Sequence, residues 1–362
     1  MKAVITAGGR GTRLRPITWN LNKHLIPLAN EPMLTNAFKK VAEVGIVDVA
    51  INVNPGEVDS MRAVFGDGSA WGLRLTYLEQ EGGACGVGQI LYSARSWIGE
   101  DDVLLYFGDN VVLGSLQQLV DKFVNERLDA SFAFVEVADP ERFGVPEFDA
   151  HGALIAIREK PAVPPSRFAQ TGLYLYRMPK YLEAFEQITP SARGEYEISD
   201  INTHMVRQGK VGYQIMHGWW KDTGTPEALL EGNQLLLNEM TQAEAVVDAS
   251  LAKLDDTRIQ GRVKIGKDCI FGEDVLIRGP VVIGDNVQID HAFIGPHTTI
   301  GSGARVSRAQ IQHSIIMEGA QVMADTMIVD SIVGKNAIVT SERSSLPHGK
   351  CLIIGENSQV EI

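Results

Sequence analysis

Short apolar runs alternate with amphipathic stretches through the first 225 residues of the chain. The apolar runs are mostly rich in β-branched residues, which is typical of buried strands. Five such strands are predicted, at residues 1–7, 47–53, 103–110, 129–137 and 171–176. The apolar positions that follow Pro32 recur at helical spacing until Gly45, and they predict a helix there. Strands that alternate with helices indicate an α/β domain with a mostly parallel sheet covered on both faces.

A six-residue period replaces this pattern from about residue 259. The repeated apolar positions, with a shift of one residue after the sixth, are Ile259, Ile265, Phe271, Ile277, Ile283, Ile289, Ile294, Ile300 and Val306. Glycine often follows the apolar residue, as in "IGKDCI" and "IGDNVQ". This hexapeptide repeat predicts a parallel β-helix whose apolar side chains fill a triangular core. Such prisms stack well against copies of themselves, so we expect a homo-oligomer formed through this domain.

A bridging helix is expected between the two patterns. Thr225 is a plausible N-cap, Pro226 suits the first helical position, and the helix should extend to about Met240. The chain is therefore expected to divide into an N-terminal domain at 1–240, which includes the bridging helix at 225–240, and a β-helix domain at 241–362.

Composition narrows the possible partners. The 362 residues are 44% hydrophobic and carry a formal net charge of −12, which argues against nucleic-acid or membrane binding. The three cysteines lie far apart, and their spacing suits neither a disulfide framework nor a metal site. With no signal-peptide pattern and no apolar run of about 18 residues, a cytoplasmic protein is expected. A basic cluster in such a chain indicates a local site for a small anion.

That cluster is the segment "GGRGTRLRPITWNLNKHLIP" at residues 8–27. A glycine-rich turn directly after a strand presents backbone N–H groups to a phosphate. The segment lacks the ending of a P-loop and the third glycine of a dinucleotide fingerprint. Arg13 and Lys23 flank the turn and are the candidate phosphate-binding cations. The residues expected to cradle a nucleotide are Gly8, Gly9, Gly11 and Thr12.

Taken together, the motifs resemble a known enzyme family. The pattern G-G-x-G-T-R-L-x-P with a later lysine resembles the sugar-1-phosphate nucleotidylyltransferases. The further motifs are "YFGDN" at 106–110, "RFGVPEFD" at 142–149, "REKP" at 158–161, "TGLYLY" at 171–176, "ARGEYEISD" at 192–200 and "WWKDTGT" at 219–225. Their order is similar to that of the glucose-1-phosphate thymidylyltransferases, and the hexapeptide tail is similar to that of the long form. The resemblance implies a Rossmann-like nucleotidyltransferase domain with a mixed, mostly parallel sheet, followed by a left-handed parallel β-helix.

The implied reaction joins a hexose-1-phosphate to a nucleoside triphosphate and releases pyrophosphate, with glucose-1-phosphate and dTTP as the expected substrates. The attacking phosphate is already an anion, so no general base is needed, and catalysis rests on positioning and electrostatics. Arg13 would stabilise the departing phosphates, and Lys23 would bridge the α-phosphate and the sugar phosphate. In the family, two aspartates share a Mg²⁺, and Asp109 and Asp222 match them.

Other family positions fall around the hexose phosphate. The matching residues are Gly144, Glu159, Lys160, Tyr174 and Trp220. Glu159 is expected to accept hydrogen bonds from sugar hydroxyls, and Lys160 to pair with the sugar phosphate. Arg193 and Glu195 lie in a further family segment, without an assigned role.

Two departures from the family pattern bear on specificity. In "EQEGGACGVGQ" at 79–89, Gln80 fits the glutamine that pairs with a pyrimidine base, but Gly86 opens Gly-Val-Gly where the family has Gly-Leu-Ala. The extra glycine predicts a looser loop, which leaves thymine and uracil as alternatives. Gln170 stands where an apolar residue usually precedes Thr-Gly-Leu-Tyr, and its amide is expected to contact the sugar.

Two further functions remain open from the sequence. Some hexapeptide-repeat domains transfer acetyl groups, for which His291, His297 and His313 are the candidate bases of a bifunctional uridylyltransferase/acetyltransferase. A catalytically inactive regulatory subunit would keep the same two-domain plan. Because such subunits lose the cations or aspartates that this chain retains, we expect an active enzyme.

Overall fold

The computed structural model describes residues 1–80, 85–216, 218–242, 258–341, 349–350 and 352–361. It separates into two compact units, one formed by Met1–Gly9 and Leu34–Asp222, the other by Arg10–Met33 and Thr223–Ile362. The basic segment of the sequence is therefore divided: its first glycines belong to the first unit and the rest to the second.

The first unit is built on a seven-stranded sheet with the order β12-β8-β11-β6-β1-β4-β5. Those strands are β1 (Lys2–Thr6), β4 (Asp48–Val53), β5 (Arg74–Glu79), β6 (Asp102–Phe107), β8 (Ala130–Glu136), β11 (Phe168–Arg177) and β12 (Val211–Ile215). Only β11 runs antiparallel to its neighbours within this sheet. The mixed, mostly parallel sheet and its five predicted strands are confirmed, with ends within three residues of the predicted ones.

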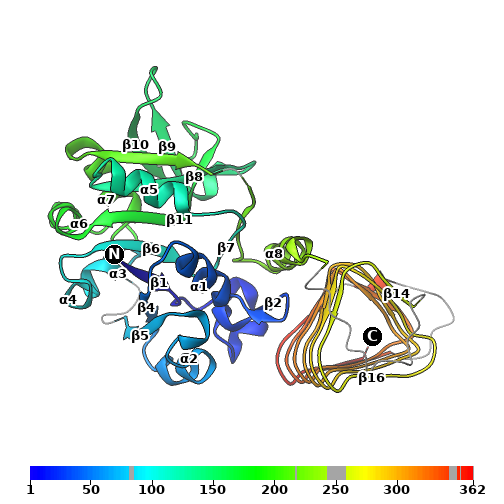
Figure 1. Ribbon diagram of the computed structural model, residues 1–362. Helices are drawn as coiled ribbons and strands as arrows, with labels where there is room; N and C mark the ends of the chain where they lie inside the picture. Colours follow the sequence, from blue (N-terminus) through cyan, green and yellow to red (C-terminus); the bar gives the residue numbers. More distant parts are fainter. Residues whose placement is uncertain (81–84, 217, 243–257, 342–348, 351, 362) are drawn as a thin grey trace. The chain divides into compact units, whose positions relative to one another are not determined.

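Helices and two small ladders complete this unit (Figure 1). The helices are α1 (Leu34–Glu43), α2 (Val58–Phe65), α3 (Gly88–Ser93), α4 (Arg95–Ile98), α5 (Gln117–Asn125), α6 (Met178–Phe185) and α7 (Ile198–Gln208), with single 3₁₀ turns at Ser69–Trp71 and Pro140–Arg142. The ladders pair β9 (Gly144–Phe148) with β10 (Leu154–Glu159), and β7 (Asn110–Val112) with β13 (Trp220–Asp222). An aromatic-rich core that includes Phe132, Phe134 and Tyr176 packs against the sheet.

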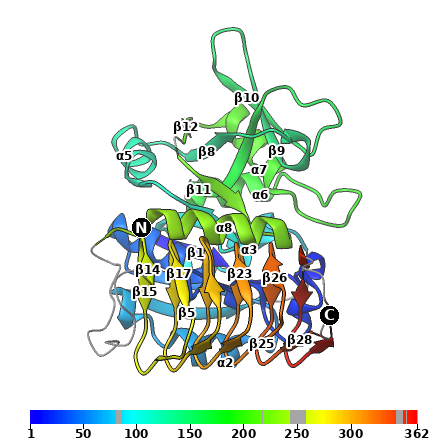
Figure 2. The same cartoon turned by 90° about the vertical axis from the view of Figure 1, so that its right-hand side faces the viewer.

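The second unit contains a left-handed parallel β-helix. Its three six-stranded sheets are β14-β17-β20-β23-β26-β29, β15-β18-β21-β24-β27-β30 and β16-β19-β22-β25-β28-β31. The strands are Ile259–Gln260, Val263–Ile265, Ile270–Phe271, Leu276–Arg278, Val281–Ile283, Gln288–Asp290, Phe293–Ile294, Thr298–Ile300, Arg305–Ser307, Gln310–Gln312, Ile315–Ile316, Gln321–Met323, Met327–Val329, Ile332–Val333, Ile338–Thr340, Gly349–Lys350, Ile353–Ile354 and Gln359–Glu361, numbered β14 to β31 in order. Successive coils stack in parallel register (Figure 2).

The hexapeptide period has the predicted consequence. Repeat positions such as Ile277, Ile294 and Val306 belong to one continuous apolar core inside the prism, with exposures of 1% or less. The shift after Ile289 is absorbed at a corner between coils, because Phe293–Ile294 still pairs in register with Leu276–Ile277. A one-residue change in coil length therefore leaves the inward direction of the side chains intact.

The second unit also holds the predicted bridging helix and the segment at 10–33. Helix α8 (Pro226–Glu239) begins as expected, because the Thr225 side chain accepts a hydrogen bond of 3.3 Å from the N–H of Ala228. Three 3₁₀ turns at Thr12–Leu14, Ile17–Trp19 and Lys23–Leu25 precede a hairpin of β2 (Pro27–Leu28) and β3 (Glu31–Pro32). Both parts pack on the β-helix, the hairpin through Asn30 and the helix end through Leu237.

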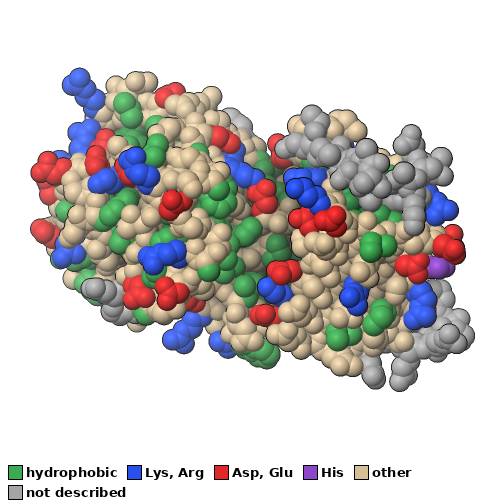
Figure 3. Space-filling model, turned by 60° about the horizontal axis from the view of Figure 1, so that its bottom comes forward, with side chains coloured by type: hydrophobic (Ala, Val, Ile, Leu, Met, Phe, Trp, Pro, Cys, Tyr) green, Lys and Arg blue, Asp and Glu red, His purple; other side chains and the backbone are tan. Residues whose placement is uncertain are grey.

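Two surface properties complete the description. Among the described helices, none combines the length and apolar character that crossing a membrane requires. On the face shown in Figure 3, acidic and basic side chains are scattered among one another and do not gather into a patch of one sign.

Candidate functional site

The first half of the nucleotide loop lies at the carboxyl end of β1. The N–H of Gly9 donates to Oδ1 of Asn54 at 3.0 Å, and the backbone of Gly9 is left-handed with φ 98°. A side chain at Gly8 would come within 3.2 Å of Asn54 Oδ1 and 3.3 Å of Gln80 Oε1. Gln80 follows β5 directly, so the structure brings the predicted base-pairing residue beside the predicted phosphate loop.

The second half of the loop carries the two candidate cations. Gly11 has φ 53°, and a side chain there would come within 3.3 Å of the Cβ of Lys23. Thr18 Oγ1 donates to the Gly11 carbonyl at 2.7 Å, which closes the loop over the 3₁₀ turn that contains Arg13. Within this unit, the stem of Lys23 thus lies against the glycine turn, while Arg13 is exposed.

The predicted base-reading segment is described from Cys85 onward, and residues 81–84 lie outside the described residues. A side chain at Gly86 would come within 2.6 Å of the Tyr196 carbonyl. Gly88 donates to the Tyr196 carbonyl at 2.9 Å, and the Tyr196 N–H donates to the Cys85 carbonyl at 2.8 Å. The glycines therefore allow close backbone pairing with the "ARGEYEISD" segment.

Asp109 and Asp222 meet through the ladder of β7 and β13. Asp222 pairs in register with Asn110, the residue that follows Asp109. The Asn110 amide donates to Asp109 Oδ1 at 2.9 Å, which orients that carboxylate. Both aspartates are partly exposed. Two hard carboxylates with an open side fit Mg²⁺, which binds one or two protein carboxylates and takes its other ligands from phosphates and water.

Trp220 connects this carboxylate pair to a second cluster of predicted site residues. Its indole Nε1 donates to Asn110 Oδ1 at 2.7 Å and to the Thr171 carbonyl at 2.9 Å. Its ring packs edge-on against Phe143, with centroids 5.3 Å apart. Asn110 lies next to Asp109, and Thr171 and Phe143 lie next to Gln170 and Gly144, so one side chain links the two sets of predicted residues.

This cluster consists of Gly144, Glu159, Gln170 and a residue the sequence reasoning missed, Ser199. Ser199, in the first turn of α7, donates its single hydroxyl proton to Glu159 Oε2 at 2.7 Å, and the same oxygen lies 3.4 Å from Gln170 Oε1. Gln170 is 5% exposed, and its Nε2 has no hydrogen-bond partner among the described residues. A buried donor without a partner is costly, so this amide is suited to a ligand acceptor.

Charged residues surround Glu159. Lys160 Nζ lies 3.2 Å from Glu159 Oε1, and Arg193 lies 3.6 Å from the same oxygen. Arg193 also pairs with Glu197 at 2.8 Å, and this carboxylate raises the pKa of the guanidinium. The motif "ARGEYEISD" contains both Arg193 and Ser199, so the resemblance pointed to the segment but not to these contacts.

Tyr174 is a buried residue of β11, and the Glu159 carboxylate lies near enough to act on its hydroxyl. It is 2% exposed and packs against Phe107, Phe132 and Tyr176 in the core of the sheet. Burial raises the pKa of its hydroxyl well above the ordinary value, so the group stays neutral. Its contact with a sugar stays a prediction.

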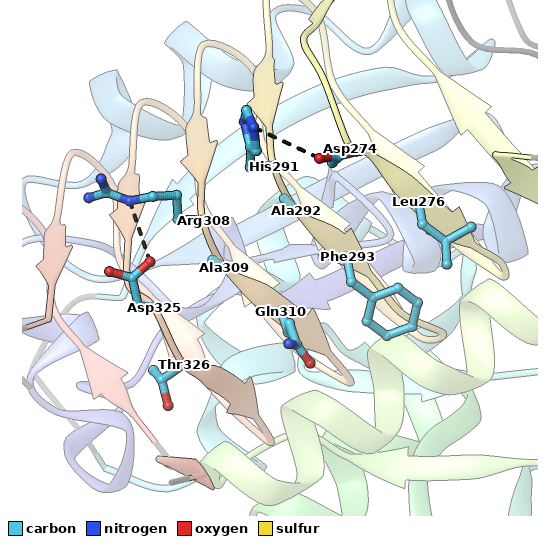
Figure 4. A pocket seen from close by; sticks show the side chains of 10 residues that line it. All are labelled: Asp274, Leu276, His291, Ala292, Phe293, Arg308, Ala309, Gln310, Asp325 and Thr326. Carbon is cyan, nitrogen blue, oxygen red and sulfur yellow. Dashed lines mark ion pairs between the residues drawn. The ribbon is translucent and has the colours of Figure 1, made fainter. Parts of the chain in front are cut away.

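The three histidines considered as acetyl-transfer bases all have side-chain partners in the second unit. His291 Nδ1 lies 2.8 Å from Asp290 Oδ2, which raises the pKa of the ring. His291 borders an open hollow across four coils, in which it also approaches Asp274, while Arg308 pairs with Asp325 (Figure 4). The other two, His297 and His313, contact Asn238 and Asp330 respectively.

Comparison with known proteins decides the family. A family model described as nucleotidyl transferase matches residues 2–239, and a model of the GMPPB C-terminal domain matches residues 277–361. The chain belongs to the nucleotidyl transferase family. This nucleotidyltransferase is 34% identical over 368 residues to the low-salt glycan biosynthesis nucleotidyltransferase Agl11 of Haloferax volcanii, with 100% of both chains covered.

This nucleotidyltransferase is also 36% identical to the glucose-1-phosphate thymidylyltransferase of Streptomyces griseus, over 100% of this chain and 99% of that one. A crystal structure of a putative glucose-1-phosphate thymidylyltransferase from Bacillus anthracis, in complex with a sucrose, superposes with a TM-score of 0.62 at 36% identity. It covers 67% of this chain and 96% of its own. The resemblance to long-form glucose-1-phosphate thymidylyltransferases is confirmed, and the chain is an enzyme of the sugar-1-phosphate nucleotidyltransferase family.

Proposed function

We propose that this nucleotidyltransferase joins glucose-1-phosphate to dTTP, forming dTDP-glucose and pyrophosphate, with Mg²⁺ as cofactor. The observation that carries the proposal is the continuous set of contacts from Asp109 and Asp222, through Trp220, to the cluster of Glu159 and Gln170. This set supports the proposal because two carboxylates that suit Mg²⁺ are linked to a polar cluster, and the full-length relatives include named glucose-1-phosphate thymidylyltransferases.

In the proposed reaction, an oxygen of the sugar phosphate forms a bond to the α-phosphorus while the bond from that phosphorus to the β-phosphate oxygen breaks. Pyrophosphate leaves with the electron pair, and no proton is transferred. The backbone at Gly8, Gly9 and Gly11, together with Thr12, would cradle the triphosphate. Arg13 would neutralise the leaving phosphates, and Lys23 would hold the two reacting phosphates together.

Asp109 and Asp222 would hold the Mg²⁺, which supplies positive charge at the α-phosphate. On the sugar side, Glu159 would accept hydrogen bonds from hydroxyls, with Ser199 fixing one carboxylate oxygen. Gln170 would donate its buried Nε2 to a sugar oxygen, and Lys160 would pair with the sugar phosphate. Gln80 would pair with the base, and Gly86 would keep the adjoining segment close to Tyr196.

The test is a grid of pyrophosphate release measured with five nucleoside triphosphates and several sugar-1-phosphates. The proposal expects the highest kcat/KM for dTTP with glucose-1-phosphate, and full loss of activity with EDTA that added Mg²⁺ restores. A higher kcat/KM for UTP than for dTTP would instead identify the enzyme as a uridylyltransferase. No release with any pair, at any metal concentration, would refute it.

We also propose a cytoplasmic, homo-oligomeric enzyme. Among the described residues, Cys269 is a free thiol, which fits a reducing compartment. The β-helix exposes apolar surface at Ile270, which is 60% accessible on β16. Light scattering of the full chain gives the oligomeric state, and Ile270→Lys should shift an assembly that uses this face towards the monomer.

A further inference from the structure

One face of the β-helix is apolar on its outside. On the sheet of β15, β18, β21, β24, β27 and β30, the residues adjacent to the inward row point away from the core. Of these, Val282 is 8% exposed, while Thr299, Ile315 and Ile332 are 0% exposed. The corresponding row on the sheet of β16 carries the exposed Gln288 and Arg305. The first sheet is therefore a covered face.

Part of the cover is the hairpin that follows Lys23. Ala29 and Asn30 form the turn between β2 and β3, both with left-handed backbone at φ 49° and 63°. The Asn30 side-chain amide donates to the carbonyls of Ile300 at 2.7 Å and Val282 at 3.3 Å. These carbonyls belong to two successive coils, so the hairpin tip is fastened across the step between them.

Helix α8 secures the same tip from the other side. The Ala29 N–H donates to Asn233 Oδ1 at 2.8 Å. Asn233 is 0% exposed, and its Nδ2 donates in turn to the His297 carbonyl at 3.3 Å. The turn is therefore hydrogen-bonded both to α8 and to the β-helix.

A second contact fastens the beginning of the same segment. A side chain at Gly355, in the last coil, would come within 3.1 Å of the Pro16 carbonyl and 3.2 Å of its Cβ. Lys23 lies midway in sequence between Pro16 and Asn30. The stem of Lys23 lies against Gly11, the residue that directly precedes the first 3₁₀ turn. The loop is thus held by the β-helix at two points on either side of Lys23.

We propose that the β-helix positions the catalytic loop, with Asn30 as the positioning residue. In this role the C-terminal domain takes part in the nucleotidyl-transfer step, because it fixes where the Lys23 ammonium and the Arg13 guanidinium meet the triphosphate. The proposal rests on the proposed function for the role of these two cations. The anchoring itself is a separate property, which can be measured without any substrate.

The test compares Asn30→Gly with Asn286→Gly in the full-length protein. Glycine keeps the left-handed backbone at both positions and removes only the amide. Asn286 has φ 56°, is exposed on a β-helix turn, and lies outside the loop, so its substitution controls for the loss of an asparagine at such a position. Asn233→Ala removes the other fastening of the hairpin and serves as the second variant.

Two readouts are needed. The first is kcat/KM for the nucleoside triphosphate and for the sugar-1-phosphate, because displacement of a catalytic group by about 1 Å can cost up to 100-fold. We expect about a 10-fold or greater loss in kcat/KM for Asn30→Gly, a loss in the same direction for Asn233→Ala, and none for Asn286→Gly. The second is the rate of tryptic cleavage after Arg13 and Lys23, which should rise in the first two variants.

A purely structural role would lower the melting temperature without changing kcat/KM of the folded enzyme. Wild-type kcat/KM in Asn30→Gly would overturn the proposal, whatever the cleavage rate, and so would unchanged cleavage in both hairpin variants. If the wild-type protein turns over no pair of substrates, the proposed function fails. The cleavage rates would still decide whether the β-helix holds the loop.

Discussion

A single methyl group at Gly144 should disturb the proposed sugar-binding cluster. Gly144 begins β9, and a Cβ there would lie 2.6 Å from Gln170 Oε1 and 2.9 Å from Ser199 Oγ. Both neighbours are buried, at 5% and 0% exposure, so neither can swing into solvent. Gly144→Ala therefore has to push Gln170 back, together with the Ser199 hydroxyl that holds Glu159.

The size of the effect follows from the geometry. An ordinary contact begins near 3.4 Å, so the Gln170 amide must retreat by about 0.8 Å. Overpacking of this kind costs about 1–3 kcal/mol, and a displacement near 1 Å in a site costs up to about 100-fold in rate. We expect kcat/KM for the hexose-1-phosphate to fall about 30-fold, which corresponds to about 2 kcal/mol. KM for the nucleoside triphosphate should change little.

The assay is steady-state pyrophosphate release with each substrate varied in turn. The double variant Gly144→Ala/Gln170→Ala is the matched control, because truncating Gln170 removes the nearer of the two atoms that the new methyl meets. The kcat/KM of the double variant for the hexose-1-phosphate should equal that of Gln170→Ala alone and should be higher than that of Gly144→Ala. Wild-type kinetics in Gly144→Ala, or a double variant no better than the single one, would refute the steric reasoning.

Three further predictions test other parts of the chain. Asp109→Asn and Asp222→Asn should each lower kcat by about 100-fold or more at saturating Mg²⁺, because each removes negative charge that would hold the cation; an activity within 10-fold of wild type would contradict the metal assignment. Gln80→Ala should reduce the preference for a pyrimidine over a purine nucleotide by up to about 10-fold, the value of one hydrogen bond; an unchanged ratio of kcat/KM values would separate Gln80 from base recognition. Burial lowers the pKa of His297 from 6.5, so the unfolded chain protonates first as the pH falls, and stability is lost below about pH 6.5. His297→Gln should therefore show a shallower fall in melting temperature from pH 7 to pH 5 than wild type, and equal slopes would exclude this contribution.

Much of the fold could be predicted from local patterns. The β-branched apolar runs specify strands, because a strand that is buried on both faces of a sheet is apolar along its whole length. This pattern can be read from the run itself. The six-residue period specifies the β-helix, since each coil returns its apolar side chain to the same inward direction, even past the shift after Ile289. Residue types also indicated the chemistry, because glycine-rich turns and basic side chains suit phosphates. What these patterns leave open is which surfaces face one another.

Contacts between distant segments were decided only by the tertiary structure. Asp109 and Asp222 become neighbours through a short antiparallel ladder, and no local pattern near either residue reports that pairing. Ser199 is part of the site because α7 begins beside β10, which makes its hydroxyl a partner of Glu159. Asn30 looks like an ordinary turn residue in sequence, yet it bonds to two coils of the β-helix. Local sequence determines the elements through short-range propensity and burial. The shape of the site depends on contacts between distant segments, and these contacts form only when the chain has folded.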